Sequence, residues 1–176
     1  MRQIERVILL VLRLALGGVF LWAAYVKLWP PASGPQAFAD SIKGFKLLPP
    51  EGDHLVTLAT FAVPWVEGLA GAVLVLGLWS RAAALVLLLN LLAFIAAIVW
   101  VLERGISTKC GCFGKFSPFC PEQITTCNIV QNAVLGGVAL VIVLRGGGLL
   151  SLDREASRRA RRASKRDGEL AVLEAK

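Results

Sequence analysis

The sequence is short of charged residues and contains a single histidine. Charged residues make up 18% of the 176 residues, which is well below the share in an ordinary soluble domain. There is no phosphate-binding glycine loop, no serine–histidine–aspartate set and no histidine cluster for a metal, since His54 stands alone. These absences argue against nucleotide-binding, serine-hydrolase and histidine-metal enzymes. The hydrophobic residues, 56% of the chain, become the main guide to its class.

Four hydrophobic runs are long enough to cross a lipid bilayer, because a membrane helix needs about 20 apolar residues. They predict helices over residues 7–29, 55–79, 82–102 and 128–144. The first run is too long for the core of a cleaved signal peptide, and no convincing small-residue cleavage site follows it. We therefore expect an all-α integral membrane protein, with a bundle of four transmembrane helices over residues 1–144.

The basic residues indicate how such a bundle would be oriented. With four spans, the arginines near the N-terminus, Arg81 and the basic tail at 145–176 all fall on one side of the membrane. The positive-inside rule then predicts that both termini are cytoplasmic and that the loop at 103–127 is extracytoplasmic, at a bacterial inner membrane. The net charge of +7 therefore reflects topology and contact with membrane lipids, and no nucleic-acid partner is expected.

All four cysteines lie in the loop at 103–127, where disulfides persist if the loop is extracytoplasmic. They are Cys110, Cys112, Cys120 and Cys127. A disulfide within Cys-Gly-Cys would close only a small ring and should therefore be strained. Strained, exposed disulfides are the oxidising, catalytic or labile ones. The neighbouring Lys109 and Lys115 favour the nucleophilic thiolate. The second pair is spaced for a structural disulfide or for a second redox pair. Four cysteines allow three pairings, and the spacing does not choose among them.

Three interpretations of this cysteine cluster are open: redox-active thiols, purely structural disulfides and a four-thiolate metal site. The cluster lacks the paired Cys-x2-Cys arrangement that is typical of structural zinc. We therefore expect no metal. The redox interpretation is favoured, and structural disulfides are the main alternative.

Charged residues also fall inside the expected spans, where an ionisable group is costly and is by default a candidate for function. Glu67 lies well within the second span, and either Arg13 or Lys27 of the first span could be its charge partner. Glu67 is predicted to be a proton acceptor or quinone-site residue, or else part of a structural ion pair. The two basic residues could instead snorkel to the membrane interfaces. Interhelical hydrogen bonds are predicted for Asn90, Gln131 and Asn132.

Several motifs, taken in order, resemble the DoxX/MauE group of small four-helix membrane proteins. They include Leu12-Arg13-Leu14-Ala15-Leu16-Gly17, Pro64-Trp65-Val66-Glu67, Gly77-Leu78-Trp79-Ser80-Arg81 and Cys110-Gly111-Cys112-Phe113-Gly114. The last motif is similar to the methylamine-utilisation (MauE) branch, and the resemblance covers roughly residues 7–144. It implies a role in maturing methylamine dehydrogenase, beside a thioredoxin-like partner. It also implies a fold like that of the quinone-coupled disulfide-forming enzymes of the vitamin K epoxide reductase type.

The sequence and the resemblance together predict a membrane thiol–disulfide redox protein. It would link an extracytoplasmic thioredoxin-like partner to quinone, as a thiol:quinone oxidoreductase. In this hypothesis Cys120 or Cys127 exchanges with the partner, and Cys110 and Cys112 form the pair nearer the membrane.

The charged residues of the spans complete this hypothesis. Glu67 handles protons, and Arg13 or Lys27 offers positive charge to a reduced quinone. The competing hypothesis is a non-catalytic membrane subunit whose loop disulfides brace a surface on which a partner docks.

Overall fold

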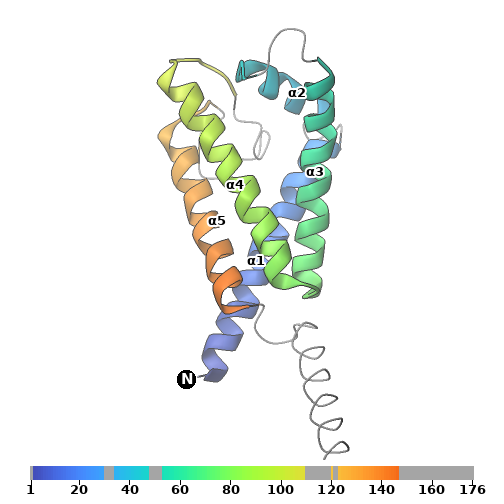
Figure 1. Cartoon of the computed structure of the whole chain (residues 1–176), viewed down its shortest axis with the longest axis vertical. Helices are drawn as coiled ribbons and strands as arrows, with labels where there is room; N and C mark the ends of the chain where they lie inside the picture. Colours follow the sequence, from blue (N-terminus) through green and yellow to red (C-terminus); the bar gives the residue numbers. More distant parts are fainter. Residues whose placement is uncertain (1, 30–33, 48–52, 110–119, 121–122, 147–176) are drawn as a thin grey trace, which may run out of the picture.

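The computed structural model describes residues 2–29, 34–47, 53–109, 120 and 123–146 (Figure 1). These residues form α1 (Arg2–Leu28), α2 (Gly34–Gly44), α3 (Asp53–Leu76), α4 (Ser80–Glu103) and α5 (Thr126–Arg145). Four of these helices, α1, α3, α4 and α5, are long and apolar enough to cross a membrane. The predicted fold class, an all-α bundle of four membrane helices, is therefore confirmed. Cys110, Cys112 and nearly all of the predicted basic tail lie outside the described residues.

The junction between α3 and α4 falls earlier than the hydrophobic run predicted. That run continues to residue 79, but α3 ends at Leu76 because Gly77 takes a positive φ of 76°. The amides of Gly77 and Leu78 donate to the carbonyls of Leu74 and Val73, which satisfies the last carbonyls of the helix. Hydropathy does not register this turn, since its residues are themselves largely apolar.

Helix α2 lies in the segment between the first two predicted spans, for which the sequence analysis predicted no helix. Its buried residues are Gly34, Phe38 and Ser41, which share one face at helical spacing. The helix contacts both α1 and α3. In Figure 1 it lies across one end of the bundle, beside the start of α3. We call this end the loop end, and the opposite end, which carries the starts of α1 and α4, the tail end.

The long helices pack in two main pairs, α1 with α3 and α4 with α5, and α3 joins the pairs through α4. The central core is built mainly from aliphatic residues such as Leu16, Leu74, Leu87 and Ile142. A second cluster, which we call the loop-end cluster, contains Phe45, Ile98, Val101 and Ile124, with Phe94 and Trp100 packed against it. Many large apolar side chains on the outer surface of the bundle are exposed, as expected of helices that face lipid.

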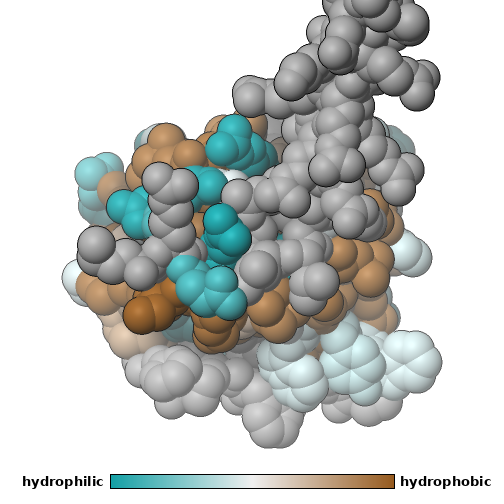
Figure 2. Space-filling view, turned by 90° about the horizontal axis from the view of Figure 1, so that it is seen from below, coloured by the Kyte–Doolittle hydropathy of each residue, from teal (hydrophilic) through white to brown (hydrophobic). Residues whose placement is uncertain are grey.

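Charged residues gather at the tail end. Arg145 Nη1 lies 3.3 Å from Glu5 Oε1, and this ion pair links the end of α5 to the start of α1. Arg81 is exposed at the start of α4. Figure 2 views the molecule from this end and shows hydrophilic residues gathered among hydrophobic ones. Because both partners of the ion pair are exposed, it contributes at most about 1 kcal/mol to stability.

The α1–α3 pair depends on glycines that allow the two backbones to approach. A Cβ at Gly17 would lie 2.6 Å from Val75 Cγ2 and 2.9 Å from the carbonyl oxygen of Gly71. The reciprocal Cβ at Gly71 would lie 3.0 Å from the carbonyl oxygen of Gly17. Small residues at such a crossing let membrane helices gain close packing where lipid offers no hydrophobic driving force.

We expect Gly17→Leu to destabilise the bundle by about 1–3 kcal/mol, because the new side chain overpacks the α1–α3 interface. Gly18→Leu is the matched control, since among the described residues no neighbouring atom lies within 4 Å of a Cβ at position 18. Thermal unfolding of the two variants in the same detergent measures the difference. An equal loss of stability in both variants would contradict the close crossing.

Candidate functional site

Lys27 and Glu67 form an ion pair inside the bundle. Lys27 Nζ lies 2.6 Å from Glu67 Oε2, and each side chain is only 2% exposed. Lys27 is the second-last residue of α1, whereas Glu67 lies near the middle of α3. The two meet because α1 starts beyond the other helices at the tail end and stops short of the loop end (Figure 1). Of the two cations that the sequence offered as partners for Glu67, the structure pairs Lys27 with it.

Asn90 of α4 engages the second oxygen of the same carboxylate. Its Nδ2 donates to Glu67 Oε1 at 3.0 Å, so both carboxylate oxygens accept a hydrogen bond. Three spanning helices thus contribute one side chain each to a single polar site. The interhelical hydrogen bond predicted for Asn90 is present. Such a bond is favoured inside a membrane bundle because the alternative is a polar group left in hydrocarbon.

Two phenyl rings flank the Lys27 ammonium. Nζ lies 5.2 Å from the centroid of Phe38 in α2 and 5.1 Å from the centroid of Phe94 in α4. Both distances are within the range for cation–π attraction. Phe94 also packs against the loop-end cluster. Helix α2 therefore covers the charge pair on its loop-end side, and Phe94 connects the pair to the loop-end cluster.

Arg13 is buried on α1, at 2% exposure, but in another part of the bundle. It precedes Lys27 on the same helix by about four turns, a rise of roughly 20 Å. The two cations therefore cannot serve one small site together. Lys27 is the one that lies with Glu67, Asn90 and the phenyl rings.

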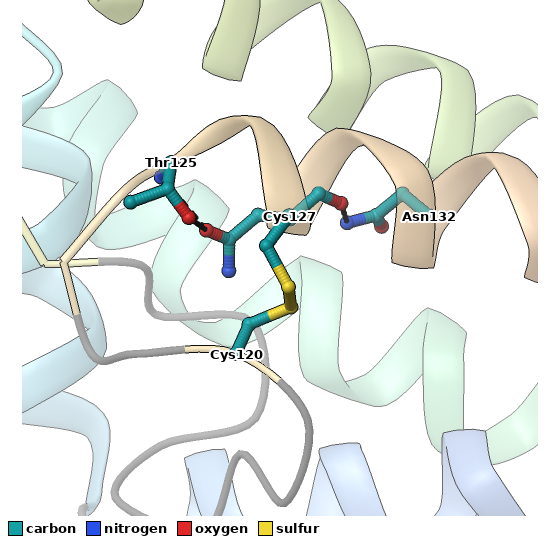
Figure 3. The surroundings of a disulfide bond; sticks show 5 residues. Cys120, Thr125, Cys127 and Asn132 are labelled. Atoms are coloured by element: carbon teal, nitrogen blue, oxygen red, sulfur yellow. Dashed lines mark hydrogen bonds between the residues drawn. A yellow bond between two sulfur atoms is a disulfide. The ribbon is translucent and has the colours of Figure 1, made fainter.

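Cys120 and Cys127 form a disulfide at the loop end of α5. Cys127 lies in the first turn of that helix and is half-buried, whereas Cys120 is only 7% exposed. Figure 3 shows the bond on the side of this first turn, with Cys120 reaching it from the preceding segment. The structure thus identifies one of the disulfides that the sequence left open, the bond between Cys120 and Cys127. Cys110 and Cys112 lie outside the described residues.

Polar residues organise the same end of α5. The backbone amide of Thr125 donates to Asn128 Oδ1 at 2.9 Å, as part of a capping box that starts the helix. Asn132 Nδ2 donates to the carbonyl oxygen of Asn128 at 2.7 Å (Figure 3). This bond lies within one helix, so the interhelical bond predicted for Asn132 is not the one seen. Gln131 is half-buried on the same helix, and its predicted bond stays a prediction.

A short ribbon connects the disulfide to the rest of the loop end. Lys109 and Gln123 form an antiparallel bridge, and the amide of Ile124 donates to the carbonyl oxygen of Thr108 at 3.2 Å. Ile124 then packs into the loop-end cluster. The two flanks of the cysteine loop are therefore paired where the loop leaves α4 and enters α5.

The sequence analysis missed α2 and the two phenylalanines around Lys27. The signal was present in part, since Phe38, Ser41 and Phe45 recur at helical spacing. Phe94 gave no signal of its own, because it is one apolar residue within an apolar span.

Comparison with known proteins gives one result. A family model described as methylamine utilisation protein MauE matches residues 5–145, and this confirms the resemblance inferred from the motifs. Neither the curated proteins nor the solved structures contain a match.

Proposed function

The chain belongs to the MauE family of methylamine utilisation proteins, and we propose that it is a membrane thiol–disulfide redox protein. It links an extracytoplasmic thioredoxin-like partner to quinone, in the maturation of methylamine dehydrogenase or in related disulfide chemistry. The observation that carries this proposal is the Cys120–Cys127 disulfide at the loop end. It lies at the same end of the bundle as α2, which covers a buried charge pair.

The exposure of the two sulfur-bearing residues favours one order of exchange. A thiolate of the partner attacks Cys127, the more exposed of the pair, and Cys120 leaves as a thiolate that takes up a proton. A second partner thiolate then attacks the mixed disulfide. The partner is oxidised by two electrons, and Cys120 and Cys127 are left as two thiols. The reverse sequence reduces the partner.

Cys110 and Cys112 receive the two electrons in the next exchange, in which their disulfide is reduced as Cys120–Cys127 re-forms. When bound in the bundle, a quinone would be the final acceptor of the two electrons and two protons. The groups around Lys27 suit such a flat, oxygen-bearing ring in their chemistry, because an ammonium and two phenyl rings come together there. Lys27, Phe38 and Phe94 would hold it. Arg13, about four turns away along α1, lies outside this group of residues.

Glu67 is the group that handles protons in this proposal. Its carboxylate is neutralised by Lys27 and held by Asn90, so the site carries no net charge at rest. Any change that draws the Lys27 ammonium away leaves the carboxylate without its counter-ion in a dry site. Taking up a proton then relieves the buried charge.

Two features of the disulfide support a second candidate, a non-catalytic subunit in which the loop disulfide braces a docking surface. Cys120 is buried, and Cys127 stands in the first turn of a capped helix. Both features also suit a permanent structural disulfide. The two candidates differ in whether the disulfide exchanges with a partner.

The proposed orientation places the loop end outside the cytoplasm. A variant that keeps Cys127 as its only cysteine should therefore react with a membrane-impermeant thiol reagent on intact cells. In a cysteine-free chain, Leu78→Cys at the tail-end turn is the control, and it should react only after lysis. Mass spectrometry of the labelled protein gives the readout. The reverse pattern would overturn the orientation and, with it, exchange with an extracytoplasmic partner.

A further inference from the structure

We infer that α2 transmits the oxidation state of the Cys120–Cys127 disulfide to the buried Lys27–Glu67 pair. The coupling runs through the contact between Gly44 and Thr108, which we call the joint. This inference rests on the proposed function, since it describes how the partner-facing disulfide regulates the charged site. It is carried by a continuous series of contacts between described residues.

The first contacts run from the disulfide to the ribbon. Cys120 is bonded to Cys127 in the first turn of α5, and Gln123 and Ile124 follow within the closed ring. Gln123 is bridged to Lys109, and the Ile124 amide donates to Thr108. The closed ring therefore restrains the segment that pairs with Thr108. Reduction opens the ring and leaves that segment held by its backbone pairing and by the packing of Ile124 in the loop-end cluster.

The next contacts run from the ribbon to the end of α2. Thr108 packs so closely on Gly44, the last residue of α2, that a Cβ at position 44 would overlap Thr108 Oγ1 and lie 3.2 Å from Thr108 Cβ. Phe45, the residue after α2, is buried in the same cluster as Ile124. The segments on both sides of the bridge thus pack against the end of α2.

The last contact runs from α2 to the charge pair. Phe38 places its ring over Lys27 Nζ, and this ring belongs to the buried face of α2. The ion pair from Lys43 to Asp53 adds little to this hold on α2, because both of its side chains are exposed. When the ribbon loosens, α2 loosens with it, and Lys27 and Glu67 lose part of their cover.

Hydrogen exchange of the full-length protein in lipid nanodiscs tests this inference. We compare the oxidised protein with the protein reduced by a phosphine. Amides of α2 and of Phe45 should exchange about tenfold faster after reduction, as expected when a local unit opens more often. Amides of α4 around Ala84, in the central core, should not change. Equal exchange of α2 in the two states would overturn the inference.

A Cys120→Ser/Cys127→Ser variant shows whether this disulfide is the one responsible. It should match the reduced wild type and show no response of α2 to the reductant. If α2 in this variant still responds to the reductant, another bond controls it and the inference is wrong.

Two substitutions test the joint from opposite sides. Gly44→Val pushes Thr108 away from α2, and Thr108→Ala removes the side chain that packs on Gly44. Each should leave the disulfide intact by non-reducing mass spectrometry while α2 exchanges equally fast in both redox states. Gly137→Val is the matched control, since Gly137 is exposed on α5 and among the described residues no neighbouring atom lies within 4 Å of a Cβ there. It should keep the redox difference.

The readout requires neither a partner nor quinone. A residue with only a structural role would alter exchange in both redox states without abolishing their difference. If both joint variants retain the difference, Gly44 and Thr108 are not the joint. If α2 does not respond to the redox state but Cys127 still forms a mixed disulfide with a partner, this inference alone is rejected. If α2 responds but Cys127 forms no mixed disulfide, the proposed function alone is rejected.

Discussion

Replacing Cys120 by serine is expected, under the proposed function, to leave the protein joined through Cys127 to a thioredoxin-like partner. Thiol–disulfide exchange passes through a mixed disulfide, which persists when the cysteine that resolves it is missing. Cys127 is the more exposed of the two and stands at the start of α5, so the partner reaches it first. Cells that express Cys120→Ser should accumulate an adduct that a reductant dissolves. Non-reducing electrophoresis followed by mass spectrometry identifies the partner and the bonded cysteine.

Cys127→Ser is the matched variant, because it removes the other half of the same disulfide. It leaves the thiol of Cys120, which is only 7% exposed, so the yield of adduct should fall by about tenfold or more. Equal adducts from both variants would contradict the order of attack inferred from exposure.

The other interpretations of the cysteines give different results in the same experiment. A structural brace predicts that both variants lower the amount of protein and that neither yields an adduct. A metal site predicts that a single substitution releases zinc or iron, which elemental analysis of the purified protein detects. Serine in place of Cys110 or Cys112 should stop transfer to quinone and still allow the encounter with the partner.

The four spans could be predicted because hydropathy over about 20 residues is itself the physical requirement for crossing a bilayer. Their ends were less predictable, since a helix stops where the backbone turns rather than where apolar residues stop. The turn at Gly77 and Trp79 shows this, because it lies within an apolar run. Helix α2 escaped prediction because it is short and covers the bundle with one face only. Its role as a cover depends on its contact with Lys27, which the sequence alone does not show.

The site could be predicted in chemistry but not in geometry. A carboxylate and two cations inside apolar spans predict an ion pair, because a lone charge in hydrocarbon is costly. Which cation pairs with Glu67 depends on how far α1 slides along α3. That register is fixed by the close packing of Gly17 on Gly71, between residues far apart in the sequence. Local sequence holds no information about it, so Arg13 and Lys27 could not be separated beforehand.

Glu67→Gln should abolish electron transfer to quinone if Glu67 handles protons, because an amide cannot take one up. The single variant also disturbs the fold. The introduced amide can still accept a hydrogen bond from Lys27, but the lysine keeps a buried charge without its counter-ion. Removing one partner of a buried ion pair typically costs about 3–5 kcal/mol of stability. Loss of activity in Glu67→Gln alone would therefore not separate a chemical role from a structural one.

The double variant Lys27→Met/Glu67→Gln separates a chemical role of the charge pair from a structural one. It removes both charges, and methionine keeps an unbranched side chain between Phe38 and Phe94. Since a buried ion pair can often be replaced by groups of similar volume with little loss of stability, the double variant should recover most of what the single one loses. Thermal unfolding in detergent measures that recovery, and quinone reduction by the prereduced protein measures transfer. A proton-handling Glu67, or a quinone held by Lys27, predicts a stable double variant that is inactive over the whole pH range. A stable double variant with wild-type turnover would mean that Lys27 and Glu67 only hold α1, α3 and α4 together.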